Sequence, residues 1–469
     1  MDGLKALETT IRRDMARVQY PARAWVPPRT TRKSRSKVLD VLIIGAGQGG
    51  LAAAAALQRE KVDNILVVDQ NPLDRAGPWM NFARMVTLRT PKHVTGPDLG
   101  LPSLTIQSWY EAQHGEGSWE ALGLIPKETW ASYLAWYRAF LEIPVRAATR
   151  AVAVGWDEGE GELWAELSCD GQRERVFARR VVLATGIEGS GQWNVPGFIR
   201  DALPDERYSH TRGDIDFEAL AGRRVAVLGA GASAFDNASV ALEAGAAKVD
   251  LFFRRDKLVD VNPYRWAEFV GFLHHHGDLP DAQRWRFIRQ LVRMGQLPPP
   301  DTFARARKHP AFSLQPASPW TAVELVDDTI RITTPKGTFE ADFVIAGTGF
   351  VTDLATRPEL ATVHEHVARW SDRYTPPADE QHADLARHPY LGRSFEFMPR
   401  VPEASPWVSR IHNYTFGCLP SLGFGGASIS GMKYSIPRLV GGITASLYRE
   451  DAEGFYASLC AYDTKEFDV

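Results

Sequence analysis

The stretch GAGQGG at residues 45–50, which directly follows the apolar run VLII (41–44), decides the fold of this chain. A second stretch, GAGASA at residues 229–234, follows RVAVL (224–228) in the same way. A glycine-rich turn between a buried strand and a helix is typical of dinucleotide-binding units, in which the turn carries the pyrophosphate. Two such turns predict two bound dinucleotides and an α/β fold with two Rossmann-like domains.

The three glycines of the first turn serve different purposes. Gly45 is expected to turn the chain out of the strand, Gly47 to let the backbone approach a pyrophosphate, and Gly50 to let the next helix pack closely. The helix formers LAAAAALQ follow, and the positive end of such a helix favours an anion. A second apolar run ends at Asp69, 24 residues after Gly45, where a carboxylate can bind a ribose hydroxyl. The first turn therefore suits FAD or NAD.

The second turn differs at the ribose end of its predicted site. The strand VDLFF at 249–253 leads into Arg254 and Arg255, where an acidic residue would otherwise stand. A guanidinium binds the 2′-phosphate of NADP through two hydrogen bonds. A solvated strand end is the alternative interpretation of this pair, but the register of the pair with the glycines favours an NADPH site.

Composition limits the classes of protein to which this chain can belong. It has 469 residues, of which 44% are hydrophobic and 24% charged, as in an ordinary soluble protein of about two domains. A formal net charge of −3 without a basic stripe disfavours nucleic acid as a partner. No apolar run approaches the ~18 residues of a membrane span, and the N-terminus lacks the apolar core of a signal peptide. We therefore expect a cytoplasmic protein without a membrane span.

Cysteine and histidine patterns point away from a redox disulfide and from a metal site. Cys169, Cys418 and Cys460 are too few and too far apart for a disulfide framework, a metal cluster or the close cysteine pair of disulfide reductases. The three adjacent histidines at 274–276 cannot share one helical face. This favours a solvated or cofactor-facing histidine cluster over a metal site.

The hydrophobic pattern predicts two helices and a long loop. Residues 3–18 form an amphipathic helix, predicted to pack against the body of the protein or a subunit rather than a membrane. Residues 71–118 are rich in proline, glycine and aromatic residues, and a loop of this length is usually functional. In PKETWASYLAWYRAFL, Trp130, Leu134 and Tyr137 lie on one face and are predicted to be core residues. The apolar face of the first helix consists of Leu4, Leu7, Ile11, Met15 and Val18.

Five further motifs occur in order along the chain: GPW at 77–79, WASYLAWY at 130–137, LATG at 183–186, GASAFD at 231–236 and AGTGF at 346–350. Together with the glycine turns they resemble single-component flavin-containing monooxygenases and the related Baeyer-Villiger and N-hydroxylating enzymes. The resemblance implies that the first turn holds FAD and the second NADPH. It also implies that the reduced flavin takes up O2 as a flavin peroxide and transfers one oxygen atom to a small organic substrate.

The motif order and the resemblance predict a nested arrangement, in which an NADP-binding domain is inserted in an FAD-binding domain. Strands at 145–156, 162–169 and 175–186 would form a small sheet, and DFVIAGTGF at 342–350 would lead the chain back to the first domain. The predicted divisions are an N-terminal helix and linker at 1–37, the FAD-binding domain at 38–204 and 343–469, and the NADP-binding domain at 205–342.

The motifs assign most of the candidate site to cofactor binding. His210 fits the family's pattern ahead of the second turn, but Pro204 and Glu206 depart from it, which disfavours a typical Baeyer-Villiger enzyme. The residues expected to bind FAD or NADPH are Gly45, Gly47, Gln48, Gly50, Asp69, Gln70, Trp79, Thr185, Gly186, His210, Gly229, Gly231, Ser233, Ala234, Arg254, Arg255 and Gly349.

Arg89 stands near the position at which the family carries an asparagine beside the flavin. With Lys92 and His93 it forms a basic cluster in the long loop, which would face an anionic substrate or the flavin, or else only solvent. Arg89 is the candidate catalytic residue and Lys92 the candidate substrate-binding residue. Because a subgroup of similar proteins hydroxylates urate, the cluster makes an anionic heterocycle such as urate a plausible substrate.

Two other functions remain open at this point. An NADPH-dependent flavin oxidoreductase that passes electrons to a quinone or a protein acceptor, without oxygenation, needs the same two sites. The second is a non-catalytic redox-sensing or binding flavoprotein, although both turns and their ribose-end residues are intact. The substrate depends on loop geometry, which the fold does not dictate.

Overall fold

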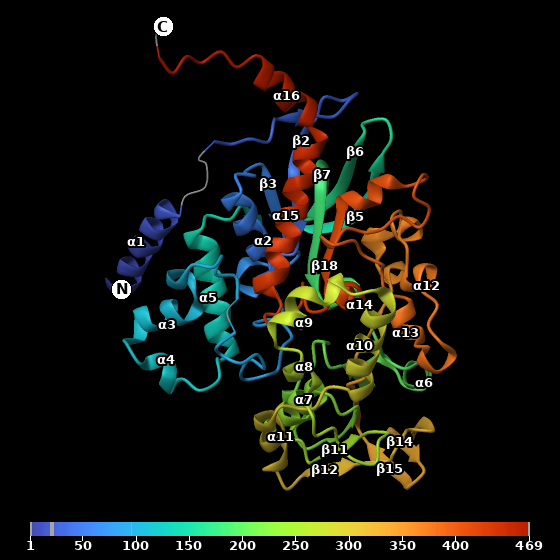
Figure 1. Cartoon of the computed structure of the whole chain (residues 1–469). Coiled ribbons are helices and arrows are strands. Elements are labelled where there is room, and N and C mark those ends of the chain that lie inside the picture. Colours follow the sequence, from blue (N-terminus) through green and yellow to red (C-terminus); the bar gives the residue numbers. More distant parts are fainter. Residues whose placement is uncertain (1, 19–22, 95, 468–469) are drawn as a thin grey trace.

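The larger of two sheets with parallel central strands, a mixed sheet, forms the upper half of the molecule in Figure 1. The computed structural model describes residues 2–18, 23–94 and 96–467. The larger sheet runs in the order β4-β3-β2-β7-β6-β5, with β18 beside β7 and β1 beside β2. Its strands are β1 (Arg29–Thr30), β2 (Lys37–Ile44), β3 (Ile65–Val68), β4 (Val145–Arg146), β5 (Arg150–Asp157), β6 (Glu162–Cys169), β7 (Gln172–Gly186) and β18 (Ile411–Thr415).

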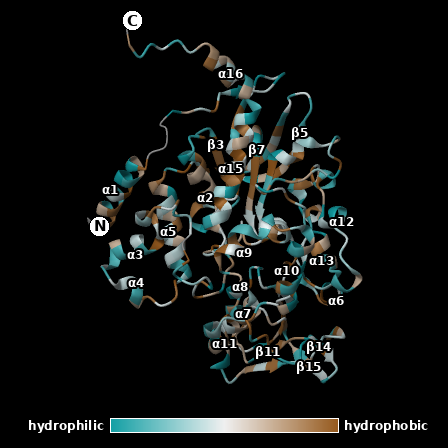
Figure 2. Ribbon diagram, in the orientation of Figure 1, coloured by the Kyte–Doolittle hydropathy of each residue, from teal (hydrophilic) through white to brown (hydrophobic). Residues whose placement is uncertain are grey.

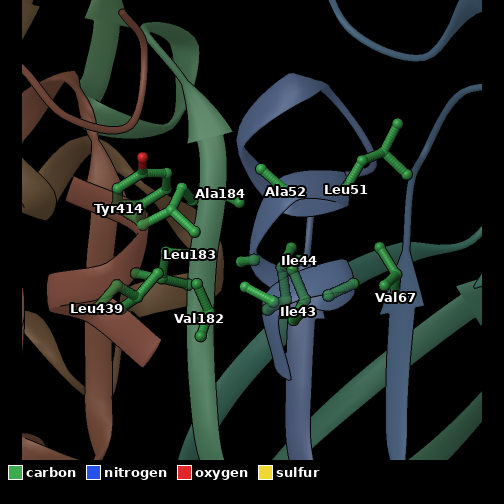
Figure 3. Packing of buried hydrophobic residues seen from close by; sticks show 14 of the residues in the cluster. Ile43, Ile44, Leu51, Ala52, Val67, Val182, Leu183, Ala184, Tyr414 and Leu439 are labelled. Atoms are coloured by element: carbon green, nitrogen blue, oxygen red, sulfur yellow. The ribbon is translucent and has the colours of Figure 1, made fainter. Parts of the chain in front are cut away.

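The inner stretches 41–44 of β2 and 181–184 of β7 are apolar and buried, as expected where both faces of a sheet are covered. Helices α2 (Gln48–Arg59) and α15 (Met432–Glu450) pack against each other beside the sheet, and α5 (Lys127–Phe140) packs against α2. Figure 3 shows the side chains of β2, β7 and α15 meeting in this core. Figure 2 shows the same strands in the colours of hydrophobic residues. As predicted, Trp130, Leu134 and Tyr137 of α5 are buried.

The smaller sheet carries the second glycine turn. Its strands are all parallel and run in the order β12-β11-β10-β16-β9. Helices α7 (Ala232–Glu243) and α11 (Pro300–Arg307) pack against each other beside it. The strands are β9 (Tyr208–His210), β10 (Arg224–Leu228), β11 (Lys248–Phe252), β12 (Phe312–Gln315) and β16 (Phe343–Ala346). Each sheet has a strand, glycine turn and helix at its centre, which confirms the predicted α/β fold with two Rossmann-like units.

Two details of the predicted arrangement need correction. The return to the first unit was expected at residue 343, but β16 pairs with β10 and is still a strand of the smaller sheet. The chain crosses back only afterwards, through β17 (Phe350–Thr352), which pairs with β8 (Gly191–Trp193). The strands β5 and β6 do not form a separate sheet, because β7 is long enough to pair with β6 at its start and with β18 at its end.

The remaining elements cover the two sheets. An antiparallel sheet of β13 (Ala322–Val326), β14 (Thr329–Thr334) and β15 (Gly337–Ala341) lies at the far end of the second unit. None of the helices in the described part of the chain is both long and apolar enough to cross a membrane. The other α-helices are α1 (Asp2–Arg17), α3 (Ile106–His114), α4 (Ser118–Ala121), α6 (Gly197–Arg200), α8 (Pro263–Trp266), α9 (Val270–His275), α10 (Asp281–Met294), α12 (Trp370–Arg373), α13 (Ala383–Ala386), α14 (Leu419–Leu422) and α16 (Ala452–Cys460).

The N-terminal helix α1 packs against the body of the protein, as predicted. Ile11 is completely buried, and α1 lies beside α3. Two polar contacts fix the helix further: the indole N–H of Trp136 donates to Glu8 at 3.0 Å, and Ser103 Oγ donates to Asp14 at 2.8 Å. The predicted apolar face ends earlier than expected, because α1 stops at Arg17 and Val18 is 48% exposed.

Candidate functional site

The first glycine turn leaves no room for side chains at two of its positions. Gly45 has φ +108°, and a Cβ there would lie 2.5 Å from the carbonyl oxygen of Ala184. A Cβ at Gly50 would overlap the carbonyl oxygen of Gly45. Gly47 is the N-cap of α2 and offers no side chain to the first backbone N–H groups of the helix. Those N–H groups are therefore available to a pyrophosphate.

Asp69 stabilises the first turn and also lies at the position expected to bind a ribose. It is buried at the end of β3; its Oδ2 accepts the backbone N–H of Ala46 at 2.8 Å and its Oδ1 that of Asn71 at 2.9 Å. Each carboxylate oxygen can accept a second hydrogen bond, so a ribose hydroxyl remains compatible with these contacts. The adjacent Gln70 is exposed.

Unpaired polar atoms beside the first turn fit a bound dinucleotide. Gln48 Oε1 and Trp79 Nε1 are buried and have no hydrogen-bond partner within the described part of the chain. Gly77, in the same GPW turn as Trp79, comes close to Gly47: a Cβ at Gly77 would lie 3.6 Å from Gly47 Cα. Buried polar atoms without partners are costly, and a ligand with polar groups at this place would satisfy them. The residues of the first turn therefore fit FAD.

The two units are joined where the segments that follow β7 and β16 pair with each other, as β8 and β17. Thr185 and Gly186 end β7, and Gly349 follows β16. The carbonyl oxygen of Gly349 accepts a hydrogen bond from the backbone N–H of Asn194 at 3.0 Å and lies 2.9 Å from His210 Nε2. These contacts fix the crossing between the two units.

His210 is a neutral histidine held by backbone groups on both ring nitrogens. Its Nδ1 accepts the N–H of Arg212 at 3.2 Å, so its Nε2 carries the proton that is donated to Gly349. Burial lowers the pKa of His210 to about 4, because the charged ring would be poorly solvated. The structure therefore places His210 at the end of β9, where its ring contacts Gly349 in the crossing between the units and both nitrogens are already used.

The second glycine turn repeats the backbone plan of the first. Gly229 has φ +120°, and the carbonyl oxygen of Gly347 occupies the space that its Cβ would need. Gly231 is the N-cap of α7, and a Cβ at Gly231 would have no neighbouring atom within 4 Å. Ser233 and Ala234 lie in the first turn of α7, with Ala234 packed against Gly347. This helix end is open to an anion, as the NADPH prediction requires.

The two arginines after β11 have different surroundings. Arg255 donates to the carbonyl oxygens of Met294 at 3.0 Å and Arg293 at 2.9 Å, and thereby binds the end of α10. Arg254 is exposed, and its guanidinium forms no hydrogen bond or ion pair with the described residues. Of the predicted pair, Arg254 is therefore the guanidinium available for a 2′-phosphate.

The predicted basic cluster in the long loop is divided among other partners. Arg89 Nη2 forms an ion pair with Asp236 Oδ2 of α7 at 2.6 Å. Lys92 Nζ donates to the carbonyl oxygens of Trp119 at 2.6 Å and Glu120 at 3.1 Å. Both cations are thus paired with loop or helix groups distant in sequence, while the buried Nε of Arg89 has no hydrogen-bond partner among the described residues.

The histidine cluster is only partly solvated. His276 is 1% exposed, lies 3.4 Å from the carbonyl oxygen of Pro420 through Nε2, and has its pKa lowered to about 4 by burial. His275 is exposed and contacts Asp278 at 3.0 Å. No group of three or more possible metal ligands occurs among residues 2–18, 23–94 and 96–467.

The helical insert that contains these histidines covers the glycine-rich segment 423–431. Tyr264 stacks on Phe424 with ring centroids 5.5 Å apart, and Ser430 Oγ donates to Glu268 at 3.0 Å. The same segment reaches the first turn, where a Cβ at Gly49 would lie 3.0 Å from the carbonyl oxygen of Gly426. The glycine-rich composition was visible in the sequence, but these partners were not, because no local pattern links residues so far apart.

The cysteines offer no dithiol in this fold. Cys169, Cys418 and Cys460 are free, and burial raises the pKa of the Cys418 thiol to about 12. A protonated, buried thiol is a poor nucleophile. Disulfide reduction at a cysteine pair is therefore inconsistent with this chain.

Comparisons with known proteins agree with this geometry. Residues 39–276 match the pyridine nucleotide-disulphide oxidoreductase family. The chain is 44% identical to an FAD-dependent urate hydroxylase from Xanthomonas campestris pv. campestris, over 99% of this chain and 97% of that protein. It is also 28% identical to an uncharacterized CzcO-like oxidoreductase from Geobacillus kaustophilus, over 44% of this chain and 51% of that protein.

Solved structures share the fold at low sequence identity. Ornithine hydroxylase from Pseudomonas aeruginosa matches 88% of this chain and 99% of its own, with a TM-score of 0.67 and 16% identity. A bacillithiol disulfide reductase from Bacillus cereus matches 87% of this chain and 99% of its own, with a TM-score of 0.56 and 18% identity. The match to the urate hydroxylase extends over nearly the whole chain, and the motif order agrees with the resemblance. The chain belongs to the pyridine nucleotide-disulphide oxidoreductase family, in its branch of single-component flavin-dependent monooxygenases.

Proposed function

We propose that this protein is an FAD-dependent, NADPH-using monooxygenase that hydroxylates urate or a closely similar anionic purine. One observation carries the substrate: the chain is 44% identical, over nearly its whole length, to a urate hydroxylase. The two open helix ends and the unpaired polar atoms beside the first turn support two dinucleotides in one chain. Oxygenation is favoured over electron transfer to a quinone because that relative is a hydroxylase.

The protein's own groups would bind and orient the cofactors. When bound, NADPH supplies the hydride that reduces FAD, and reduced FAD supplies the reaction with O2. Asp69 would hold the ribose of FAD, while the N-terminal end of α7 and Arg254 would hold the pyrophosphate and 2′-phosphate of NADPH. The contacts of Tyr264 with Phe424 and of Glu268 with Ser430 would shield the segment beside the first turn from bulk water.

The cytoplasm is the compartment that we propose for this reaction. A reducing compartment keeps thiols free, in accord with the three unpaired cysteines. The partners proposed are a small organic substrate and O2.

The reaction can be tested by three simultaneous measurements on the purified yellow protein: NADPH oxidation, O2 uptake and hydrogen peroxide release. Urate should accelerate NADPH oxidation and suppress hydrogen peroxide, because the oxygen atom is then transferred to substrate. A panel of amines, sulfides and ketones serves as the comparison. Rapid reduction of an added quinone with no effect of urate on peroxide would instead support the electron-transfer function.

A further inference from the structure

The loop segment 84–89 belongs to the first unit by sequence but contacts the second unit through its side chains. It follows the GPW turn within a few residues. Thr87 Oγ1 donates to Asp301 Oδ2 at 3.0 Å, and Arg89 Nη2 pairs with Asp236 Oδ2 at 2.6 Å. The segment is thus fastened to both α11 and α7.

A buried charge makes the Arg89–Asp236 pair the stronger of these links. The side chain of Asp236 is 3% exposed and that of Arg89 is 27% exposed. Thr302 Oγ1 also donates to Asp236, at 3.2 Å. Burial raises the pKa of Asp236, while Arg89 and, more weakly, Arg305 favour its ionised form. Without Arg89 the buried carboxylate would lose its main counter-charge, and breaking such a pair is strongly destabilising.

The ion pair lies between the two cofactor turns. Asp236 is in α7, the helix that begins directly after Gly231 of the second turn. At the other end, the GPW turn that precedes segment 84–89 approaches Gly47 of the first turn. The segment therefore connects the loop that touches the FAD turn with the helix that follows the NADPH turn.

We propose that Arg89 and Asp236 are a positioning pair that sets the separation of the two dinucleotides, and that Arg89 does not bind substrate. The inference rests on the proposed function. Flavin reduction moves a hydride from NADPH to FAD; NADPH is oxidised to NADP⁺, and FAD is reduced and takes one further proton from solvent. Reacting atoms must lie about 3–3.5 Å apart, and a misplacement of about 1 Å costs about 100-fold in rate. An element that fixes the two units relative to each other therefore controls this step.

The first test measures the anaerobic rate of flavin reduction against NADPH concentration. In Arg89→Ala we expect the limiting rate to fall about 10- to 100-fold, while FAD content and NADPH affinity change little. Asp236→Asn should resemble it, and the exchange Arg89→Asp with Asp236→Arg should recover part of the rate. Arg173→Ala is the matched control, because Arg173 pairs with Glu166 at 2.7 Å within the first unit.

A second readout does not depend on turnover. Amide hydrogen exchange in the FAD-containing enzyme without NADPH should increase at residues 84–94 and 300–307 in Arg89→Ala, and not in Arg173→Ala. An unchanged limiting rate, or unchanged exchange, would overturn the proposal. A raised substrate KM with normal flavin reduction would show instead that Arg89 binds substrate. If NADPH does not reduce the wild-type flavin, the proposed function fails, whereas hydrogen exchange still tests the link itself.

Discussion

The two glycine turns share a backbone plan but differ in what surrounds them. Around the first turn, Gly47 is approached by the GPW turn and Gly49 by Gly426, a residue from the other end of the chain. Around the second turn, Gly231 has no neighbour within 4 Å of the place where a Cβ would be. The first turn is called enclosed and the second open because of this difference at the helix N-cap; Gly229 is packed as closely as Gly45. In the proposed reaction this difference separates a cofactor that stays bound from one that must enter and leave.

The open turn is also the one with a free charge. Arg254 is exposed beside it, whereas Asp69 at the first turn is buried and bonded to the turn itself. A buried, pre-organised site favours tight binding, because few groups must be ordered when the ligand arrives. An exposed arginine gives selectivity for a phosphate without enclosing the ligand.

The largest effect should come from adding one methyl group to the enclosed turn. In Gly50→Ala the Cβ overlaps the carbonyl oxygen of Gly45, so the backbone of the turn must move. We expect loss of FAD and a destabilisation of about 3 kcal/mol or more, at the upper end of overpacking effects. The measurements are flavin absorbance per protein and thermal unfolding.

Gly231→Ala, at the helix N-cap that corresponds to Gly47 of the first turn, is the comparison at the open turn. Its φ is −76°, and its Cβ meets no atom within 4 Å, so FAD content and unfolding temperature should stay close to those of the wild type. If both variants retained FAD and melted alike, the distinction between an enclosed and an open turn would be wrong.

The comparison of the two turns also assumes that the two units keep a fixed arrangement. His210 contacts the crossing between the units, so the pH dependence of stability tests this assumption. The pKa of His210 falls from 6.5 to about 4 on folding, so the unfolded chain binds a proton that the folded chain does not. Its contribution to stability is fully present above pH 6.5 and is lost as pH falls toward 4. The total is up to about 3 kcal/mol, at 1.36 kcal/mol per pKa unit.

Other buried histidines also affect the stability in this pH range, so the prediction concerns the difference in pH dependence between the variant and the wild type. The pKa values of His276, His388 and His412 are also lowered to about 4. His210→Asn should therefore reduce the slope of unfolding free energy against pH between 4.5 and 6 by about one proton. Equal slopes in denaturant titrations of the variant and the wild type would show that His210 titrates normally and does not hold Gly349 in the crossing between the units.

The elements that sequence predicted correctly are those that local pattern determines. The apolar runs before each glycine turn became β2 and β10, and the helical face of Trp130, Leu134 and Tyr137 became core. In each case the residues that decide the structure are neighbours in the chain, so hydrophobic period and glycine spacing suffice.

Features that depend on distant partners were missed. The partner of Arg89 is Asp236, 147 residues away, and nothing near Arg89 indicates a buried carboxylate. The burial of His276 depends on Pro420 in the same manner. Strand β16 was assigned to the wrong unit because an apolar strand followed by glycines has the same local pattern whichever sheet it joins. For the basic residues of the long loop, which were predicted to face a substrate, the flavin or solvent, the local pattern likewise did not indicate their tertiary partners.

The smallest effect concerns the phosphate end of the open turn. Loss of a charged hydrogen bond costs about 1.5–3 kcal/mol, so Arg254→Ala should raise the KM for NADPH about 10- to 150-fold. The KM for NADH should hardly change, because NADH lacks the 2′-phosphate.

Arg255→Ala is the control. Arg255 binds the carbonyl oxygens at the end of α10, so its loss should have a weak and equal effect on the KM values of both nucleotides. If Arg255→Ala alone abolished the preference for NADPH, Arg255 rather than Arg254 would bind the 2′-phosphate. The phosphate would then lie beside the end of α10 and not at the open side of the turn. Steady-state kinetics with both nucleotides on the FAD-containing variants separates these outcomes, since the enclosed turn is unchanged in each.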